Sequence, residues 1–336
     1  MRLQKTQESE DRGVRKNSFP NQWGQDRGTH EDRNQIYENG SGISHDSDYS
    51  DICQTPSDFF IERNCKQLFD VSASGKTRGK NIELIENRKF GSYRLLERIA
   101  KGGLATIWLA SDEGGSTCAL RVMHDTFRMG SSGPRLFRRG CEVMKILPPH
   151  PNVVGYIDHG VESRRDYIAL DYIEGLNLRE LMVRKDPLLI DILSDLAVEL
   201  ADALEHVHDH GYMHLDVKPE NIIISRAGTL YLCDFDTARE IPDKPIKIEK
   251  KSGTPFYMSP EVTNGWKFDH RADIYAFAVT IYELLTNVKP FEGQTQKAML
   301  ANQLNARYRI RKLREFNSNI PIGLDELILK CLDFIP

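Results

Sequence analysis

The hydrophobic and polar positions divide the chain into a polar first quarter and a regularly patterned remainder. Residues 1–58 are rich in Asp, Glu, Arg, Asn, Gly and Ser and contain almost no aliphatic side chains. Such a segment cannot bury enough apolar surface to offset the entropy lost on ordering, which predicts disorder. Residues 59–71 have the spacing of a short amphipathic helix, and residues 72–80 form a linker of Ser, Gly and Lys. We therefore interpret residues 1–89 as a polar N-terminal extension.

Alternating patterns from residue 90 onward predict a small β-rich lobe that ends near residue 170. Strands are expected at residues 93–99, 106–110, 118–123, 152–158 and 167–172. Residues 134–147 instead carry apolar side chains at helical spacing on one face. These side chains are Phe137, Cys141, Met144 and Leu147. The small lobe should therefore contain about five antiparallel strands and one helix.

Beyond residue 175 the apolar spacing becomes mainly helical. Helices are expected at residues 176–184, 188–210 and 269–285, with a hairpin formed by residues 221–224 and 231–233. An irregular basic segment with four lysines and two prolines follows the hairpin at residues 240–251. The chain order is thus a small antiparallel β lobe, a connector and a larger mainly helical lobe over residues 175–336, an α+β fold.

Composition and charge narrow the class of protein further. A net charge of −4 gives no general reason to expect binding to nucleic acid or to acidic membranes. No secretory signal is visible in residues 1–12, and the most apolar long stretch, residues 275–285, is too short to span a bilayer. The six cysteines form no C-x-x-C pair, which is typical of buried thiols in a reducing compartment. We therefore expect a cytoplasmic protein without a membrane segment in this chain.

Two short polar stretches carry the candidate chemistry. Residues 214–221 read His-Leu-Asp-Val-Lys-Pro-Glu-Asn, and residues 234–236 read Asp-Phe-Asp. Together they supply two carboxylates, an amide and an ammonium at the spacing that phosphoryl transfer onto a hydroxyl requires. In this chemistry Asp216 accepts the hydroxyl proton and Lys218 neutralises the migrating phosphate. Asn221 and Asp234 would hold magnesium.

On these two stretches the chain resembles the eukaryotic-type serine/threonine protein kinases. The resemblance covers residues 90–336 and implies a bilobal kinase fold whose last helices are missing from this chain. It also implies ATP and Mg²⁺ as cofactors and a protein substrate with a serine or threonine acceptor. The residues that would contact ATP are Ile99, Gly102, Gly103, Ile107, Ala119, Arg121, Leu170, Asp171, Ile173 and Ile223.

Several of these positions depart from the family pattern. In the phosphate-binding turn, Ala100 and Ala105 stand where the family has glycine, which should make the turn stiffer and looser fitting. Arg121 stands at the position of the ATP-binding lysine, and arginine does not replace lysine without consequence. The family pairs that lysine with a glutamate on the next helix, but this position aligns with Gly140. Glu142 lies about 200° around the helix from residue 140 and substitutes only if the helix shifts.

Two more departures concern control and metal binding. Leu215 replaces the arginine of the more usual His-Arg-Asp, which removes a partner for a phosphorylated activation segment. Asp236 replaces the glycine of Asp-Phe-Gly and brings a further carboxylate near the metal position. Two roles remain open for Asp236: it helps to hold magnesium, or it pairs with Arg121.

Residues 253–261, Gly-Thr-Pro-Phe-Tyr-Met-Ser-Pro-Glu, resemble the segment on which the family docks its substrates. Thr254 joins Asp216 and Lys218 as a catalytic residue and indicates serine or threonine acceptors. The resemblance also implies that Glu261 pairs with an arginine beyond a Cys-Leu-x-x-x-Pro pattern. Here residues 331–336 end before that arginine, so Glu261 is expected to be a lone carboxylate, which destabilises the large lobe if it is buried.

We therefore predict a Mg²⁺- and ATP-dependent protein serine/threonine kinase. The alternative is a pseudokinase, a nucleotide-binding or scaffold module without turnover. The intact set of transfer residues favours catalysis. The residues that favour the pseudokinase are Arg121, Gly140, Ala100, Ala105 and Asp236. A small-molecule phosphotransferase is disfavoured by the docking segment at residues 253–261. The sequence does not indicate an oligomeric state.

Overall fold

The computed structural model describes residues 87–125, 132–247 and 254–335. All of them belong to one unit of the chain, Tyr49–Pro336. The predicted disorder of residues 1–86, the helix expected at residues 59–71 and the linker after it lie outside the described residues. The first described strand, β1 (Lys89–Phe90), crosses the expected boundary at residue 89 by one residue.

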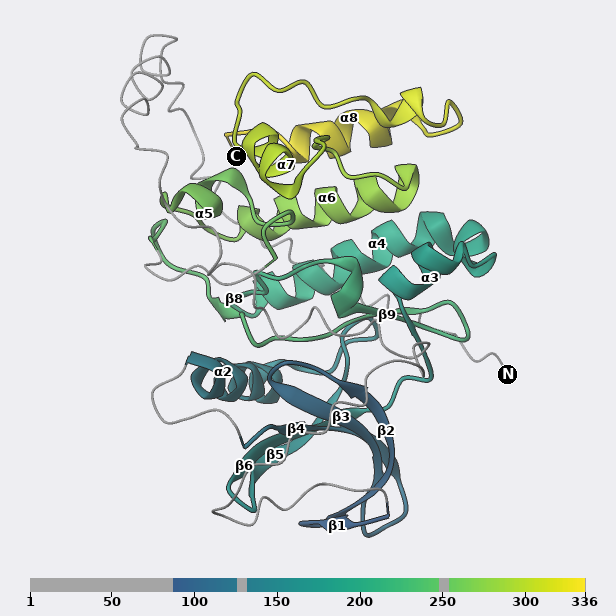
Figure 1. The fold of residues 1–336 in the computed structure, drawn as a ribbon, viewed down its shortest axis with the longest axis vertical. Coiled ribbons are helices and arrows are strands. Elements are labelled where there is room, and N and C mark those ends of the chain that lie inside the picture. Colours follow the sequence, from purple (N-terminus) through teal and green to yellow (C-terminus); the bar gives the residue numbers. More distant parts are fainter. Residues whose placement is uncertain (1–86, 126–131, 248–253, 336) are drawn as a thin grey trace, which may run out of the picture. The chain divides into compact units, whose positions relative to one another are not determined.

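The small lobe is a single antiparallel sheet (Figure 1). Its six strands follow the order β1-β2-β3-β4-β6-β5. After β1 they are β2 (Tyr93–Lys101), β3 (Ala105–Ser111), β4 (Thr117–Met123), β5 (Tyr156–Glu162) and β6 (Arg165–Asp171). The fold class is confirmed, but there is one strand more than expected. The fourth predicted strand was placed too early: Val154 donates its N–H to Leu232 of the large lobe at 3.0 Å, so sheet pairing starts only at Tyr156.

The two faces of this sheet have different surroundings. On one face a buried cluster contains Leu95, Trp108 and Leu120. On the other, Ile107 lies opposite Arg121 and Ala119 lies opposite Leu170 in the strand register. Directly opposite residues share a face, so these four side chains line one surface. All four are only partly buried.

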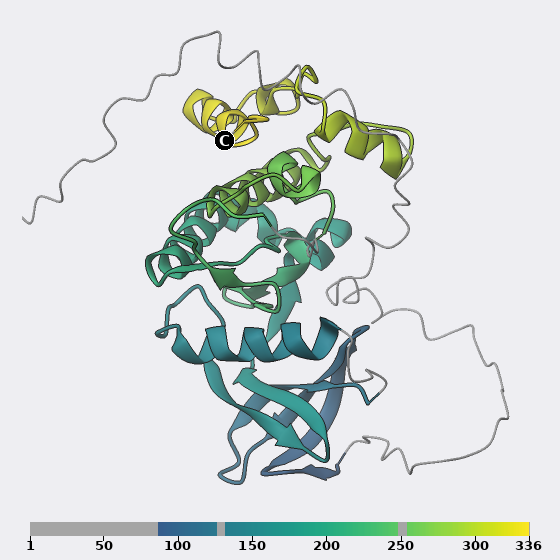
Figure 2. The same cartoon turned by 90° about the vertical axis from the view of Figure 1, so that its left-hand side faces the viewer.

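Helix α2 (Ser132–Ile146) packs against β5 and β6. The helix begins two residues earlier than expected, and its last residue lies one position before the expected end at residue 147. Phe137, Cys141 and Met144 are buried as expected. Figure 2 shows it between the sheet and the helical lobe. Arg138 forks onto the buried carboxylate of Asp166 in β6 through bonds of 2.8 and 3.0 Å, which fixes the helix to the sheet.

The large lobe is mainly helical, as predicted. Its helices are α3 (Leu178–Arg184), α4 (Leu188–Asp209), α5 (Pro260–Asn264), α6 (Arg271–Thr286), α7 (Gln296–Gln303) and α8 (Ile322–Cys331), with 3₁₀ turns η2 (Pro219–Asn221) and η3 (Leu313–Glu315). Its short strands are β7 (Gly175–Asn177), β8 (Tyr212–Met213), β9 (Ile222–Ser225), β10 (Leu230–Leu232) and β11 (Arg239–Glu240). The helix expected at residues 176–184 starts later, because Asn177 ends β7 and caps α3 by accepting the N–H of Glu180 at 2.9 Å.

One apolar core joins the two lobes. It contains Leu200 and Val207 of α4 and Val279 of α6, and it continues into the small lobe through Phe137 and Ile168. The lobes therefore bury apolar surface against each other as well as within themselves. In the part of the chain that the structure describes, no helix has the length and apolarity needed to cross a membrane.

A buried arginine links four parts of the large lobe. Arg179 of α3 bonds Glu220 of η2 at 2.7 Å and Glu283 of α6 at 2.8 and 3.0 Å, and it also contacts the Tyr257 hydroxyl. Burial alone would raise the pKa of Glu283, but Arg179, Lys289 and the Tyr257 hydroxyl together lower it to about 2. The carboxylate is therefore ionised at neutral pH and depends on its cations.

Replacing Arg179 should be costly because two largely buried carboxylates lose a partner. We expect Arg179→Met to lower the free energy of unfolding by about 3 kcal/mol, measured by urea denaturation. Arg226→Met is the matched control, because the Arg226–Glu174 pair is exposed (78% and 59%). Its loss should cost no more than about 0.5 kcal/mol. Equal losses in the two variants would contradict a structural role for Arg179.

Candidate functional site

One buried carboxylate anchors the loop of residues 214–221 by accepting hydrogen bonds from its backbone. Asp273, at the start of α6, accepts the backbone N–H of His214 at 2.8 Å and of Leu215 at 2.7 Å, and it also contacts the His208 ring at 2.9 Å. Leu215 has a φ of 64°, a left-handed conformation that side chains other than glycine rarely adopt. The bonds to Asp273 offset this strain and fix the position of the next residue, Asp216.

Leu215 has an apolar environment rather than a charged one. Its side chain packs against a small cluster formed by Met213, Phe268 and Ala272. The position where the resembling kinases have an arginine is therefore part of the packing beneath the loop. This agrees with the prediction that residue 215 offers no partner to a phosphate group.

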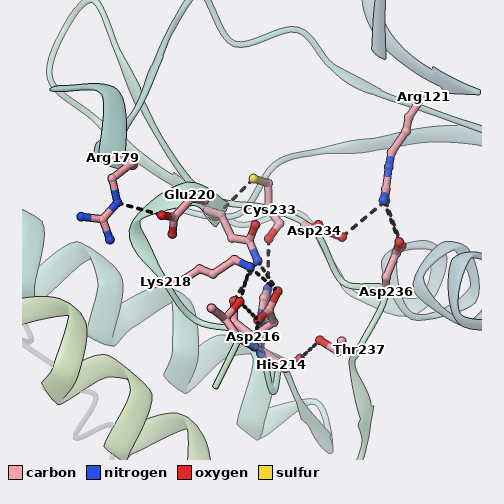
Figure 3. Close-up of polar contacts among 12 residues, drawn as sticks. Arg121, Arg179, His214, Asp216, Lys218, Glu220, Cys233, Asp234, Asp236 and Thr237 are labelled. Carbon is pink, nitrogen blue, oxygen red and sulfur yellow. Dashed lines mark hydrogen bonds and ion pairs between the residues drawn. The ribbon is translucent and has the colours of Figure 1, made fainter. Parts of the chain in front are cut away.

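Asp216, Lys218 and Thr254 form one hydrogen-bonded group. Figure 3 labels two of its members, Asp216 and Lys218. Asp216 Oδ1 accepts the backbone N–H of Thr254 at 3.0 Å and its hydroxyl at 3.1 Å. Lys218 Nζ lies 3.1 Å from Asp216 Oδ2 and also contacts the Thr254 hydroxyl. Lys218 is fully buried and Asp216 is 5% exposed. The three predicted catalytic residues thus lie together, and the lysine compensates the charge of the buried carboxylate.

Asn221 has a free acceptor at the same place. Its amide nitrogen donates to the carbonyl oxygen of Asp216 at 2.8 Å and to the carboxylate at 3.0 Å. Its Oδ1 is buried without a hydrogen-bond partner. An orphaned buried oxygen is costly unless a ligand satisfies it, and amide and carboxylate oxygens are the ligands that Mg²⁺ prefers. Asn221 and Asp234 therefore fit a magnesium site.

The segment of residues 234–236 is tied to the loop by several bonds. The backbone N–H of Cys233 donates to Asn221 O at 2.9 Å, and the His214 ring contacts Cys233 O at 3.0 Å. The Thr237 hydroxyl donates to His214 O at 2.9 Å, a contact that sequence reasoning missed. The first of these bonds joins Asn221 to Cys233, the residue that immediately precedes Asp234. Asp234 itself has a left-handed φ of 64°.

Arg121 enters this site from β4 and meets both aspartates. Its two terminal nitrogens bond Asp236 at 2.8 and 2.6 Å, and one of them also lies 3.4 Å from Asp234 (Figure 3). The guanidinium carbon lies 5.1 Å from the centre of the Phe137 ring. Burial raises the pKa of Asp236 to about 6, and the Arg121 guanidinium limits the rise. Of the two roles open for Asp236, the structure therefore supports pairing with Arg121.

Helix α2 provides no carboxylate to Arg121. Gly140 is buried and faces Asp236, as the alignment predicted for a residue facing the site. Glu142 is 62% exposed and contacts His159 at 3.2 Å, so it points away from Arg121. The expectation that Glu142 would substitute only after a helix shift agrees with this geometry.

The predicted adenine contacts lie around the start of the connector between the lobes. Leu170 and Asp171 end β6, and Asp171 donates its backbone N–H to Gly155 O at 2.9 Å. Leu170, Ile173 and Ile223 are partly buried and pack against the shared core. Ile99 lies on β2, and Ile107 and Ala119 lie on β3 and β4. The latter two share a sheet face with Arg121, so one surface leads from the connector to the aspartates.

The turn of residues 101–105 is supported by a histidine that sequence reasoning did not single out. Gly102 donates its N–H to Ala105 O at 2.8 Å, which closes the turn. One nitrogen of the His124 ring lies 3.2 Å from Gly103 O, and the other lies 2.9 Å from the Thr106 hydroxyl. Burial lowers the pKa of His124, so the ring is neutral at neutral pH. The contacts that support this turn therefore come from residues of the small lobe itself.

Glu261 is buried, at 5% exposure. It forms no ion pair with any residue in the described ranges, and burial raises its pKa above the usual value. The positive charge of Arg271 limits this rise in the pKa of Glu261.

Comparisons with known proteins agree with this geometry. A sequence model of the protein kinase domain matches residues 93–336. A probable serine/threonine-protein kinase of Clostridium perfringens is 29% identical over 246 residues, which cover 73% of this chain and 36% of the relative. The serine/threonine-protein kinase PrkC of Bacillus subtilis is 30% identical over 250 residues, covering 74% and 38%. The Aurora kinase of Eremothecium gossypii is 28% identical over 280 residues, covering 79% and 76%. The chain thus spans little more than a third of the two bacterial relatives.

Asp273 should be essential to the loop beneath Asp216. In Asp273→Asn one acceptor oxygen becomes an amide NH₂ group that faces a backbone N–H, so a buried donor loses its partner. We expect the free energy of unfolding to fall by about 2 kcal/mol, measured by urea denaturation. Asp269→Asn is the control, because Asp269 pairs with Arg271 near the surface. A loss in the control as large as that in Asp273→Asn would contradict the special role of Asp273.

The buried Glu261 should make stability depend on pH. Its pKa is raised on folding, so the folded state binds more protons and stability falls as pH rises above about 4.3, the ordinary pKa. Glu261→Gln removes this dependence, so the advantage of the variant in Tm should grow from pH 4.5 to pH 7. Glu205→Gln, on the exposed side of α4, should change Tm little at either pH. An advantage of Glu261→Gln that shrinks as pH rises would refute the assignment.

Proposed function

The chain belongs to the protein kinase family, and we propose that it transfers the γ-phosphoryl group of ATP to serine or threonine hydroxyls of proteins. The observation that carries this proposal is the group formed by Asp216, Lys218 and Thr254, where a buried carboxylate and a buried ammonium meet a hydroxyl. The serine/threonine kinases among its relatives support the choice of acceptor.

In the proposed reaction Asp216 orients the acceptor hydroxyl and takes its proton. The hydroxyl oxygen forms a bond to the γ-phosphorus while the bond from that phosphorus to the β–γ bridging oxygen breaks, and ADP leaves. Lys218 balances the negative charge that builds up on the transferring group, and it already balances Asp216 at 3.1 Å. Thr254, hydrogen-bonded to both, holds their geometry.

Asn221 and Asp234 would hold the magnesium ion. When bound, it neutralises charge on the phosphates of ATP. The unpartnered Oδ1 of Asn221 supports this assignment, because a buried amide oxygen is otherwise left without compensation. Ile107, Ala119 and Leu170 would contact the adenine, on the surface that leads from the connector to the aspartates.

We place this activity in the cytoplasm. Four cysteines lie in the part of the chain that the structure describes, and all four are free thiols. Free thiols fit a reducing compartment, which is also where ATP is available. That the protein does not bind nucleic acid remains a prediction from the charge of the chain.

One observation favours a second function, a nucleotide-binding scaffold without turnover. Arg121 lies 3.4 Å from Asp234, so a cation already stands beside the proposed metal ligand. If the guanidinium occupied the place of magnesium, ATP would bind without being turned over. The two functions make opposite predictions for phosphate transfer.

Phosphate transfer from labelled ATP and Mg²⁺ to a generic basic protein tests the proposal. We expect Asp216→Asn to lower the transfer rate at least about 100-fold, because the base for the hydroxyl proton is lost. Asp202→Asn, on the exposed side of α4, is the matched control and should transfer phosphate at the wild-type rate. Equal background in the wild type and in Asp216→Asn, together with a thermal shift on ATP addition, would instead establish the scaffold.

A further inference from the structure

The carboxylate of Asp236 fills the space beside a glycine of α2. A Cβ at Gly140 would lie 2.9 Å from Asp236 Oδ1 and 3.1 Å from its Cα and backbone N. The first of these distances is shorter than real Cβ contacts, and the other two leave little room for adjustment. A side chain at residue 140 would therefore collide with the Asp236 carboxylate and would also crowd the Asp236 main chain in this arrangement.

Both oxygens of this carboxylate are already used. Each accepts one bond from the Arg121 fork, at 2.8 and 2.6 Å. The side chains of Arg121 and Asp236 are 13% and 6% exposed, so water weakens the pair little. Asp236 is thus committed to the arginine.

Asp236 and Asp234 compete for the same guanidinium. One terminal nitrogen of Arg121 lies 2.8 Å from Asp236 and 3.4 Å from Asp234. Without Asp236, the nearest remaining carboxylate for Arg121 would be Asp234. The attraction between opposite charges grows as they approach, most strongly where water is excluded. Arg121 would then close onto Asp234 and occupy the oxygens that a metal needs.

We infer that Asp236 is a positioning residue that holds Arg121 away from full pairing with Asp234, so that Asp234 stays available to magnesium. Gly140 is part of the same device, because it provides the space for the carboxylate. This inference rests on the proposed function, since it assumes that Asp234 binds the metal when ATP is bound. Asp236, the third residue of the Asp-Phe-Asp segment, would thus act through Arg121 to keep the metal ligand Asp234 accessible.

The test measures how much Mg²⁺ the chain needs to bind a fluorescent ATP analogue. We expect Asp236→Asn, which preserves shape and removes charge, to raise the half-saturating Mg²⁺ concentration about 10-fold or more, the usual effect of losing a residue that supports a metal ligand. In Arg121→Met/Asp236→Asn no guanidinium can close onto Asp234. Its Mg²⁺ requirement should therefore return to that of Arg121→Met alone. A purely structural role for Asp236 would not produce this rescue.

A second variant tests the same device without changing a charge. Gly140→Ala adds a methyl group that displaces Asp236, so it should also raise the Mg²⁺ requirement. Alanine favours a helix over glycine, so helix propensity alone predicts no loss. Gly323→Ala in α8 is the control, because a Cβ there meets nothing within 4 Å. It should leave the Mg²⁺ requirement unchanged.

The outcomes separate this inference from the proposed function. If Asp234→Asn raises the Mg²⁺ requirement and Asp236→Asn does not, the positioning role is wrong and the metal site stands. If the double variant keeps the raised requirement, the effect does not pass through Arg121 and the inference also fails. If the wild type binds the analogue with Mg²⁺ but transfers no phosphate, the kinase activity fails while the role of Asp236 is still decided by the binding data. A wild type that binds no nucleotide overturns both.

Discussion

The site depends on a single buried carboxylate that anchors the loop of residues 214–221. Asp273 is fully buried and accepts two consecutive backbone N–H groups, from His214 and Leu215. Two such bonds fix the peptide plane between these residues and hold Leu215 in its left-handed conformation. The direction of Asp216 follows from that geometry. The contact with α6 connects the loop to a helix whose residues Val279 and Ile281 lie in the buried core.

Most of the other buried charges discussed above are arranged in ion pairs, and Glu261 is the exception. Asp216 is balanced by Lys218, Glu283 by Arg179 and Lys289, and Asp236 by Arg121. Each group joins segments that are distant in the sequence, so the ion pairs also specify how loops meet helices. A buried polar atom without a hydrogen-bond partner is also costly, which is why the free oxygen of Asn221 is informative. The molecule leaves an acceptor unsatisfied where a ligand would complete it.

Much of this arrangement could be predicted from the sequence. The small β lobe, its helix, the helical lobe and the grouping of Asp216, Lys218 and Thr254 follow from local periodicity and from a motif whose spacing is specific. The position of β5 could not be predicted, because Val153 and Val154 are apolar and β-branched like strand residues but are buried against the large lobe. The pattern of apolar residues indicates which positions are buried. It does not show whether they are buried in a sheet or at the interface between the lobes.

The partners of individual charges were the least predictable part. Arg179 is one of many arginines in helical segments, and nothing local indicates that it faces Glu220 and Glu283. A signal was available in Glu220, since a glutamate inside a buried motif requires a cation. For Asp236, two roles remained open, because the choice depends on how closely α2 and Arg121 approach residue 236. That distance is a property of the assembled fold.

The apolar core that crosses between the lobes has a consequence for how the protein comes apart. Phe137 and Ile168 of the small lobe share that core with Leu200 and Val279 of the large lobe. Separating the lobes would expose apolar surface of both lobes to water, which is unfavourable. Unfolding of one lobe therefore also destabilises the other. The described fold should therefore unfold cooperatively on heating, with both lobes unfolding together.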